Sequence, residues 1–488
     1  MNKLGIPLLW LAACLGLGAC GGDGAADPSG NSTPAENSTV GDQPGPAAKG
    51  SGEKALNLIL LVMDTCRRDR VGAYRQEQSL TPNLDLLAED AVVFEDCLSQ
   101  ASATLPSHRS LFTGHYVHRH GNITNAESMR SPYTLAEILQ KAGWKTVGFN
   151  GGGSLNPSFG LNQGFDIYQC GSGPKGGKKG VFSVFQDRLK PFFEQAGDQP
   201  FFLFLHGYDP HCPYWPPQPW RDKHGSWYQG KLALDDLCGR GDFQPLFDQD
   251  RLTEEDIRFV QSMYDGGVES ADQSLGWVLD QLRQNDLLEN SIVVFASDHG
   301  ESLGEHRWIG HIRMWEEQLQ IPLMIRFPGG AWSQRVAEPA ELLDLFPTLL
   351  TALGLPTPKG NQGFDWMPMI RGEAPPPAAE RMRLAKFAGW EAVRFDREWK
   401  LVFRHSGGKL AQKHLWNLLQ DPEETVDHYQ TEEGREIFER LYQRYRDWRR
   451  ETSDQDRRFA STLFRKRIDQ SAQRTLDELG YGGEEDEE

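Results

Sequence analysis

The sequence lacks two features that mark common classes of binding protein. Its 51 Lys and Arg residues are outnumbered by 69 Asp and Glu residues, which gives a net charge of −18. A nucleic-acid backbone needs clustered cations, so no nucleic-acid partner is expected. None of the 7 cysteines stands in a Cys-x-x-Cys pair, which argues against a structural zinc cluster. Local basic pockets for an anionic small substrate remain compatible with this composition.

The N-terminus has no hydrophobic run long enough to span a bilayer. The apolar stretch Ile6–Leu17 is short and has the form of a signal-peptide core. It ends in Leu17-Gly-Ala-Cys20, which resembles a bacterial lipoprotein cleavage box. We therefore expect residues 1–20 to be a lipoprotein signal peptide. A lipid on Cys20 would anchor the exported protein to a bacterial membrane, on the periplasmic side or at the cell surface. An ordinary secretory signal with an incidental Cys20 is the alternative.

Composition divides the mature chain, which exceeds the usual size of a single core. Residues 21–54 are dense in Gly, Ala, Pro, Ser and Asn, which predicts a flexible tether. Residues 55–372 alternate strand-like and helical patterns, which predicts an α/β domain with a central, mostly parallel sheet flanked by helices. A Pro-rich break at 373–378 precedes a smaller α+β domain over 379–481, and an acidic tail covers 482–488.

Five cysteines remain beyond the signal segment. An odd number in an exported protein leaves at least one of them unpaired, unless it bonds another chain. Cys66 and Cys212 stand beside candidate site residues, and we expect both to be buried as small apolar side chains. The five are Cys66, Cys97, Cys170, Cys212 and Cys238.

Three apolar runs, each typical of a strand buried on both faces, end in Asp or His. They are Leu56–Met63, followed by Asp64; Phe201–Leu205, followed by His206, Asp209 and His211; and Ser291–Ala296, followed by Asp298 and His299. A single Asp-His-Gly is more often a polar turn closed by its glycine. Repetition at three strand ends instead predicts a shared site, because parallel strands bring their carboxyl ends to one edge. Asp64, Asp298 and His299 are the predicted ligands of one divalent cation.

The segment 101–114 offers a nucleophile. Pro106 suits the first turn of a helix and Gly114 suits its end, which places Thr104 just before the helix N-terminus. Read alone, Thr104 is a helix cap. A hydroxyl that also coordinates a divalent cation could be deprotonated there and attack sulfur or phosphorus.

From about Leu56 to Tyr481 the chain resembles the sulfatases, within the alkaline-phosphatase-like superfamily. The segments that carry the resemblance are Met63–Thr65, Thr81–Ala88, Thr104–Gly114, Leu161–Asp166, His206–Tyr214, Ser297–His306 with Gly310–His311, Asp344–Leu350 and Leu415–Glu424. The resemblance implies that Asp64, Asp298 and His299 hold the cation, which could be Ca, Mg, Mn or Zn, and that Thr104 occupies the nucleophile position. Thr104 is also a predicted ligand of the cation. The resemblance also implies that His211 contacts the ester group. His311 falls near a Lys or His position of the family, where a protonated imidazole could protonate the leaving oxygen.

The departures from the family pattern bear on the substrate. Sulfatases carry Cys-x-Pro-Ser-Arg, or Ser in place of Cys, and oxidise the first residue to formylglycine. Here Thr104 stands first, and a secondary alcohol cannot become an aldehyde. His108 takes the Arg position, with Arg109 next to it, and Thr65 replaces a second metal-binding Asp, which suggests one cation rather than two.

Several functions therefore remain open. The expected one is hydrolysis of a sulfate ester or a related phosphoester by Thr104 or by a hydroxide held by the cation. The substrate would be an anionic small molecule or a glycan ester. A phosphoester hydrolase or phospho-group transferase is the first alternative, because superfamily relatives with a Thr nucleophile act on phosphorus. A catalytically inactive binding lipoprotein is the second.

Overall fold

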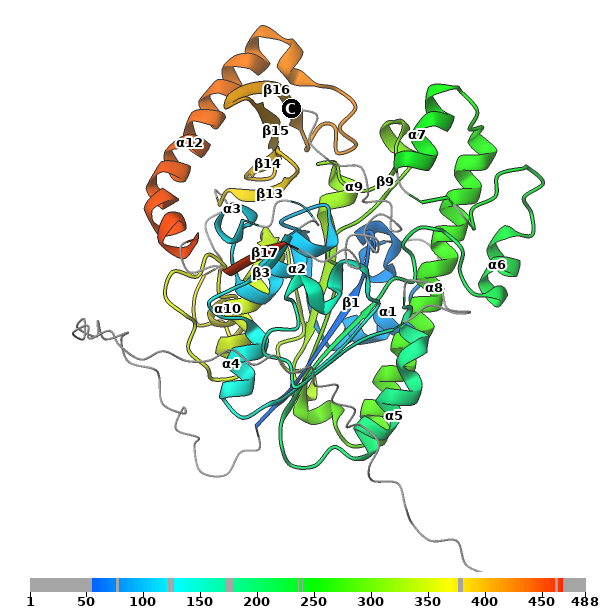
Figure 1. Ribbon diagram of the computed structural model, residues 1–488, viewed down its shortest axis with the longest axis vertical. Coiled ribbons are helices and arrows are strands. Elements are labelled where there is room, and N and C mark those ends of the chain that lie inside the picture. Colours follow the sequence, from blue (N-terminus) through cyan, green and yellow to red (C-terminus); the bar gives the residue numbers. More distant parts are fainter. Residues whose placement is uncertain are drawn as a thin grey trace, which may run out of the picture. The chain divides into compact units, whose positions relative to one another are not determined.

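Figure 1 shows the computed structural model of the chain. It describes residues 55–460 and 464–467, apart from 76–78, 122–123, 125–126, 172–179, 236, 239 and 376–380. The expected signal peptide (1–20), with its lipid-bearing Cys20, the tether (21–54) and the acidic tail (482–488) lie outside the described residues. Within the part of the chain that is described, no helix is both long and apolar enough to cross a membrane.

The centre of the molecule is a nine-stranded sheet. Strand β1 (Asn57–Met63) lies between β6 (Phe201–Gly207) and β7 (Ser291–Ala296), and it pairs with both in parallel. The order is β11 (Gln334–Val336), β2 (Val92–Leu98), β10 (Gln320–Arg326), β7, β1, β6, β4 (Lys145–Asn150) and β5 (Ile167–Cys170), with β12 (Ala340–Glu341) also pairing with β2. Only β10 among these strands runs antiparallel to its neighbours, so the predicted mostly parallel sheet is confirmed.

Both faces of the sheet are covered, which explains the apolar strands. Alternate residues of β1 enter separate cores: Leu58, Leu60 and Val62 face one, and Ile59, Leu61 and Met63 face the other. Helices α1 (Pro82–Glu89), α5 (Gln186–Glu194) and α8 (Glu254–Gln284) supply the second core. Helices α2 (Thr104–Thr113), α4 (Leu135–Lys141) and α10 (Leu345–Ala352), which are labelled in Figure 1, supply the first core together with α11 (Met367–Ile370).

Helix α2 begins one residue earlier than the sequence suggests. Thr104 is its first residue rather than the position before it, and Ala103 is the extended residue that precedes the helix. Gly114 ends the helix as predicted, with a φ of +64° that favours glycine. The N–H groups of the first turn are therefore next to the Thr104 hydroxyl.

The C-terminal part is an antiparallel sheet with one long helix. Its strands are β13 (Arg383–Phe387), β14 (Trp390–Phe395), β15 (Trp399–Ser406) and β16 (Lys409–Asn417). Helix α12 (Glu432–Ala460) packs on one face through Phe438 and Tyr445. The opposite face packs against Ala103, Met314 and Leu319 beside the nucleophile segment. This confirms the expected α+β C-terminal part.

Shorter elements complete the chain. They are β3 (Glu127–Arg130), which pairs with β17 (Phe464–Arg467), the hairpin of β8 (Ser302–Leu303) and β9 (Ile309–Gly310), and helices α3 (Val117–His120), α6 (Gln218–Gly225), α7 (Arg240–Asp248) and α9 (Glu316–Leu319).

A disulfide corrects one sequence-based expectation. Cys212 was expected to be a buried thiol, but it is bonded to Cys238 across a separation of 26 residues. The bond closes the loop that carries Tyr214 and begins directly after His211, so it restricts a segment beside the candidate site. Cys66 is a buried thiol as expected.

A buried ionic network joins the two sheets. Asp96 at the end of β2 pairs with Arg383 of β13 at 2.8 Å and with Arg394 of β14 at 3.1 Å. Arg394 also contacts Glu316 of α9 at 3.0 Å, and Lys400 of β15 lies 2.9 Å from the same carboxylate. The C-terminal sheet thereby fixes the segment that follows the β8–β9 hairpin.

Candidate active site

The strand register brings the predicted residues to one edge of the sheet. Val62 of β1 is level with both His206 of β6 and Ala296 of β7. Asp64 comes two residues after Val62, and Asp298 comes two residues after Ala296. The two carboxylates therefore lie side by side at the carboxyl edge of the sheet. His206 reaches across to Asp64, with 3.1 Å between Nε2 and Oδ2.

Asp64, Asp298 and His299 form a group that fits a cation. One ligand atom from each lies within 4.8 Å of the others, and all three side chains are fully buried. Asp298 Oδ1 accepts the N–H groups of Thr65 at 3.2 Å and His299 at 2.9 Å, whereas Oδ2 has no hydrogen-bond partner among the described residues. A buried carboxylate oxygen left this way is costly unless a positive charge meets it. Metal binding here stays a prediction that the donor set supports.

The local backbone orients these ligands. His299 Nδ1 lies 2.9 Å from the carbonyl oxygen of Gly300, so Nδ1–H donates there and Nε2 keeps its lone pair. Gly300 cannot be replaced easily, because a Cβ would meet the carbonyl oxygen of Glu317 at 2.0 Å. Thr65 has a φ of +56°, which is uncommon for a β-branched residue, and contributes its backbone N–H rather than a carboxylate.

Thr104 lies inside this group. Its Oγ1 is 3.2 Å from Asp64 Oδ2 and 3.5 Å from His299 Nε2. The Ser107 hydroxyl, one turn along α2, donates to the carbonyl oxygen of Asp298 at 2.7 Å and connects the helix to the segment that carries Asp298 and His299. The helix N-terminus favours negative charge at the Thr104 oxygen.

His311 and His211 complete the opening of the site. The His311 ring lies with its centroid 4.6 Å from that of His299 and 5.1 Å from that of His211. His211 Nδ1 donates to the carbonyl oxygen of Cys212 at 2.7 Å, which fixes that ring. The structure thus brings both predicted histidines next to the cation group.

Two residues that join the predicted site through hydrogen bonds were not assigned from the sequence. Glu301 Oε2 lies 2.7 Å from His311 Nδ1, and the Tyr214 hydroxyl donates to Glu301 Oε1. Glu301 follows Asp298, His299 and Gly300 directly, so a carboxylate in that segment was the available signal. The contact of Glu301 with His311 could not be predicted, because it forms only through the fold of the β8–β9 hairpin.

His108 and Arg109 differ in their placement. His108 lies beneath the group, with Nδ1 3.6 Å from Asp298 Oδ2, and burial lowers its pKa to about 4. Arg109 turns elsewhere: its Nη2 donates to the carbonyl oxygen of Phe159 at 2.8 Å, and burial lowers its pKa to about 10. These contacts give Arg109 a structural position rather than one facing Thr104.

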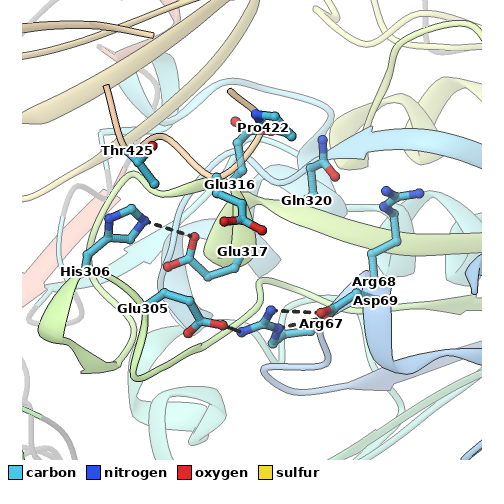
Figure 2. Close-up of a pocket in the computed structure, with 11 residues that line it drawn as sticks. Arg67, Arg68, Asp69, Glu305, His306, Glu316, Glu317, Gln320, Pro422 and Thr425 are labelled. Carbon is cyan, nitrogen blue, oxygen red and sulfur yellow. Dashed lines mark hydrogen bonds and ion pairs between the residues drawn. The ribbon is translucent and has the colours of Figure 1, made fainter. Parts of the chain in front are cut away.

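A separate pocket of about 440 Å³ lies beside the 301–311 segment (Figure 2). Arg67 stands in it between Asp69 and Glu305, and its Nη1 also donates to the carbonyl oxygen of Glu301 at 3.2 Å. His306 faces Glu317 there at 4.0 Å, and burial raises the pKa of Glu317 to about 7. The pocket is lined by other residues than the cation group, which places His306 outside the candidate site.

A mostly parallel sheet flanked by helices, with a buried Asp, Asp, His group and the Thr104 hydroxyl at its carboxyl edge, is the fold of the alkaline-phosphatase-like superfamily. The Sulfatase family model matches residues 56–355, and the model of the N-sulphoglucosamine sulphohydrolase C-terminal region matches residues 304–451. The chain therefore belongs to the sulfatase family, and it is an ester hydrolase of that family.

Individual proteins agree with this assignment. Arylsulfatase K of Canis lupus familiaris is 25% identical over 434 residues, covering 78% of this chain and 80% of the relative. The ulvan-active sulfatase of Formosa agariphila is 28% identical over 368 residues, covering 68% and 69% respectively. The crystal structure of the phosphonate monoester hydrolase of Agrobacterium radiobacter shares the fold, with a TM-score of 0.67, 20% identity and coverage of 81% of this chain and 96% of its own.

Proposed function

We propose that the protein hydrolyses an anionic sulfate ester, or a related phosphoester, with Thr104 as the nucleophile. The observation that carries the proposal is the position of Thr104 Oγ1, 3.2 Å from Asp64 Oδ2 and 3.5 Å from His299 Nε2, inside a fully buried group. A hydroxyl in contact with a carboxylate and an imidazole is placed for activation.

The residues fit a divalent cation held by Asp64, Asp298, His299 and Thr104. When bound, such a cation supplies the positive charge that favours the Thr104 alkoxide and the transferring anion. Asp64 Oδ2 is 3.2 Å from Oγ1 and is the nearest acceptor for the hydroxyl proton. The first turn of α2 adds N–H groups that favour negative charge at the same oxygen.

His311 and His211 serve the leaving side of the reaction. Glu301 accepts a hydrogen bond from His311 Nδ1, which directs Nε2 away from Glu301. Nε2 can then give a proton to the oxygen of the departing alcohol, and His211 binds the ester group beside it. The Thr104 ester that forms must be cleaved by water at sulfur or phosphorus, because no formylglycine hydrate can expel the group.

A phosphoester substrate is the second candidate. Thr104 favours it, since a threonine ester has to be resolved by direct attack, and phosphorus accepts that attack readily. The fold shared with a phosphonate monoester hydrolase is compatible with either class. A sulfated glycan fits the first candidate, because the relatives include an ulvan-active sulfatase.

The deciding experiment compares p-nitrophenyl sulfate, p-nitrophenyl phosphate, bis(p-nitrophenyl) phosphate and p-nitrophenyl phenylphosphonate as substrates. The Thr104→Ala variant is the matched blank for each. We expect turnover that depends on Thr104, and accurate mass of a trapped Thr104 peptide distinguishes a sulfate from a phosphate adduct. No turnover of any ester, together with no bound divalent metal, would leave the binding lipoprotein as the better description.

We propose that the protein is exported and held at a bacterial membrane by a lipid on Cys20. The Cys212–Cys238 disulfide supports export, because such bonds persist in oxidising compartments. In a bacterial host, the wild type should fractionate with membranes and the Cys20→Ala variant should not. If the wild type and the Cys20→Ala variant were equally soluble after removal of the membranes, the proposed lipid anchor would be wrong.

A further inference from the structure

A second group of metal-binding side chains lies next to the first. It consists of His108, one turn after Thr104 on α2, His206 at the end of β6, and Asp298 after β7. One ligand atom from each lies within 4.8 Å of the other two, and all three side chains are fully buried. The two groups have Asp298 in common.

The hydrogen bonds of the two rings fix which nitrogen of each keeps a lone pair. His108 Nδ1 is 2.8 Å from the carbonyl oxygen of Thr104, so Nδ1–H donates and Nε2 carries the lone pair. His206 Nε2 is 3.1 Å from Asp64 Oδ2, so Nε2–H donates and Nδ1 carries the lone pair. Among the described residues, His108 Nε2, His206 Nδ1 and Asp298 Oδ2 have no hydrogen-bond partner.

The first cation would meet Asp298 Oδ2, but His108 Nε2 and His206 Nδ1 would still be buried acceptors without donors, which is costly. The three side chains are close enough for one divalent cation to draw a ligand atom from each of them. Two neutral imidazoles and one carboxylate suit Zn, Mn, Fe or Co, whereas Ca and Mg prefer a shell made of oxygen atoms. The alternative is that the imidazoles of His108 and His206 bind no metal and only orient the carboxylates that hold the first cation.

We propose that His108, His206 and Asp298 hold a second divalent cation of the transition-metal type. Asp298 is then shared between the two positions. This inference goes beyond the proposed function and does not depend on Thr104 being the nucleophile. It replaces the single cation expected from the sequence with a pair.

Metal content of the purified protein tests the proposal. Mass spectrometry of the dissolved metals should give two divalent ions per chain in the wild type, at least one of them a transition metal, and only the first cation in His108→Phe and in His206→Phe. His115→Phe is the matched control, since His115 is equally buried and bonds to Tyr133 outside both groups. Thr104→Ala should retain both ions whether or not it is active. One ion in the wild type, unchanged in both histidine variants, would overturn the proposal.

A second measurement needs no variant and therefore covers the case of a variant that does not fold. Metal-stripped wild-type protein is titrated with Co²⁺, and its visible absorbance is followed. Saturation at two equivalents is expected, and Mn²⁺-loaded protein should show a spin-coupled pair in its paramagnetic resonance spectrum, because the ions share one carboxylate. Saturation at one equivalent with an uncoupled spectrum refutes the second position.

Discussion

Glu301 and His311 form a buried carboxylate–imidazole pair, with 2.7 Å between Glu301 Oε2 and His311 Nδ1. The other oxygen of Glu301 accepts the Tyr214 hydroxyl, from the loop that the Cys212–Cys238 disulfide closes. Three separate segments of the chain therefore determine where the His311 ring lies. A histidine that transfers a proton must keep one tautomer and one orientation, and this pair provides both.

Replacing Glu301 should consequently reduce turnover without removing metal. In Glu301→Gln the amide can no longer act as an anionic acceptor for His311, so we expect kcat to fall about 10²-fold. Tyr214→Phe is the matched control, because it removes one partner of Glu301 and keeps the contact with His311. Its kcat should fall much less. Equal losses in both variants would show that Glu301 acts only by supporting the loop.

Thr104 should be required for turnover while the metal site survives its loss. Thr104→Ala removes the attacking oxygen, and we expect kcat to fall at least about 10³-fold with the bound metal largely retained. Thr104→Ser restores a hydroxyl at the same position and should recover activity to within about tenfold of the wild type. Steady-state kinetics with metal analysis checks both variants. Undiminished activity in Thr104→Ala would remove this residue from the mechanism.

The sequence predicts the sheet and the cation group because these depend on local pattern. An apolar strand such as β7 needs no charged residue at its end, so Asp298 and His299 after it indicate a function. The parallel register of β1 and β7 then brings Asp298 close to Asp64. The position of Thr104 at the start of a helix can be predicted for a similar reason, because Pro106 and Gly114 mark the two ends of that helix. Residues at strand ends and helix starts are thus placed by rules that operate over a few neighbours.

The other contacts of the site depend on the conformation of its loops, and no short-range sequence pattern predicts that conformation. Glu301 meets His311 only through a hairpin of two-residue strands, which has no periodicity to detect. Cys238 stands 26 residues after Cys212, so its pairing follows from the fold of the intervening loop. Arg109 was predicted to belong to the site because it stands next to His108 in the sequence. Successive side chains of a helix differ in direction by about 100°, and Arg109 donates to the carbonyl oxygen of Phe159 instead.

Asp209 should make stability depend on pH near neutrality. Burial raises the pKa of Asp209 to about 7, and its Oδ2 accepts the Phe182 N–H at 2.9 Å. Between about pH 4 and pH 7 the unfolded chain has already lost this proton while the folded chain keeps it, so the free energy of unfolding falls as pH rises. Asp209→Asn keeps an acceptor for Phe182 but does not titrate.

The stability of Asp209→Asn relative to the wild type should therefore increase between pH 4 and pH 7, by at most about 4 kcal/mol. Urea denaturation at a series of pH values measures this difference. Asp166→Asn is a suitable control, because the pKa of Asp166 is lowered rather than raised, chiefly by hydrogen bonds from Thr146 that outweigh the effect of burial. A difference that stays constant with pH would mean that Asp209 ionises normally.

Lys400 should be the most sensitive position in the contact between the two sheets. Its Nζ lies 2.9 Å from Glu316 Oε1 and 2.8 Å from Glu424 Oε1, and the side chain is fully buried. Glu316 has a second cationic partner in Arg394, whereas Lys400 is the cation that faces Glu424. In Lys400→Met the buried Glu424 carboxyl group must either keep its charge without a cation or bind a proton, and we expect the free energy of unfolding to fall by about 3–5 kcal/mol near pH 8.

The double variant Lys400→Met, Glu424→Gln separates the loss of the charge pair from the loss of packing. A neutral Gln beside Met needs no cation, so this variant should recover a substantial part of the stability that Lys400→Met loses. Burial raises the pKa of Glu424, so the single variant should also recover toward pH 5, where that carboxyl takes up a proton. Denaturant unfolding of the wild type, the two single variants Lys400→Met and Glu424→Gln, and the double variant, each at pH 5 and pH 8, completes the cycle. If the single and double variants are equally unstable at both pH values, packing by the lysine chain and not its charge joins the C-terminal sheet to α9.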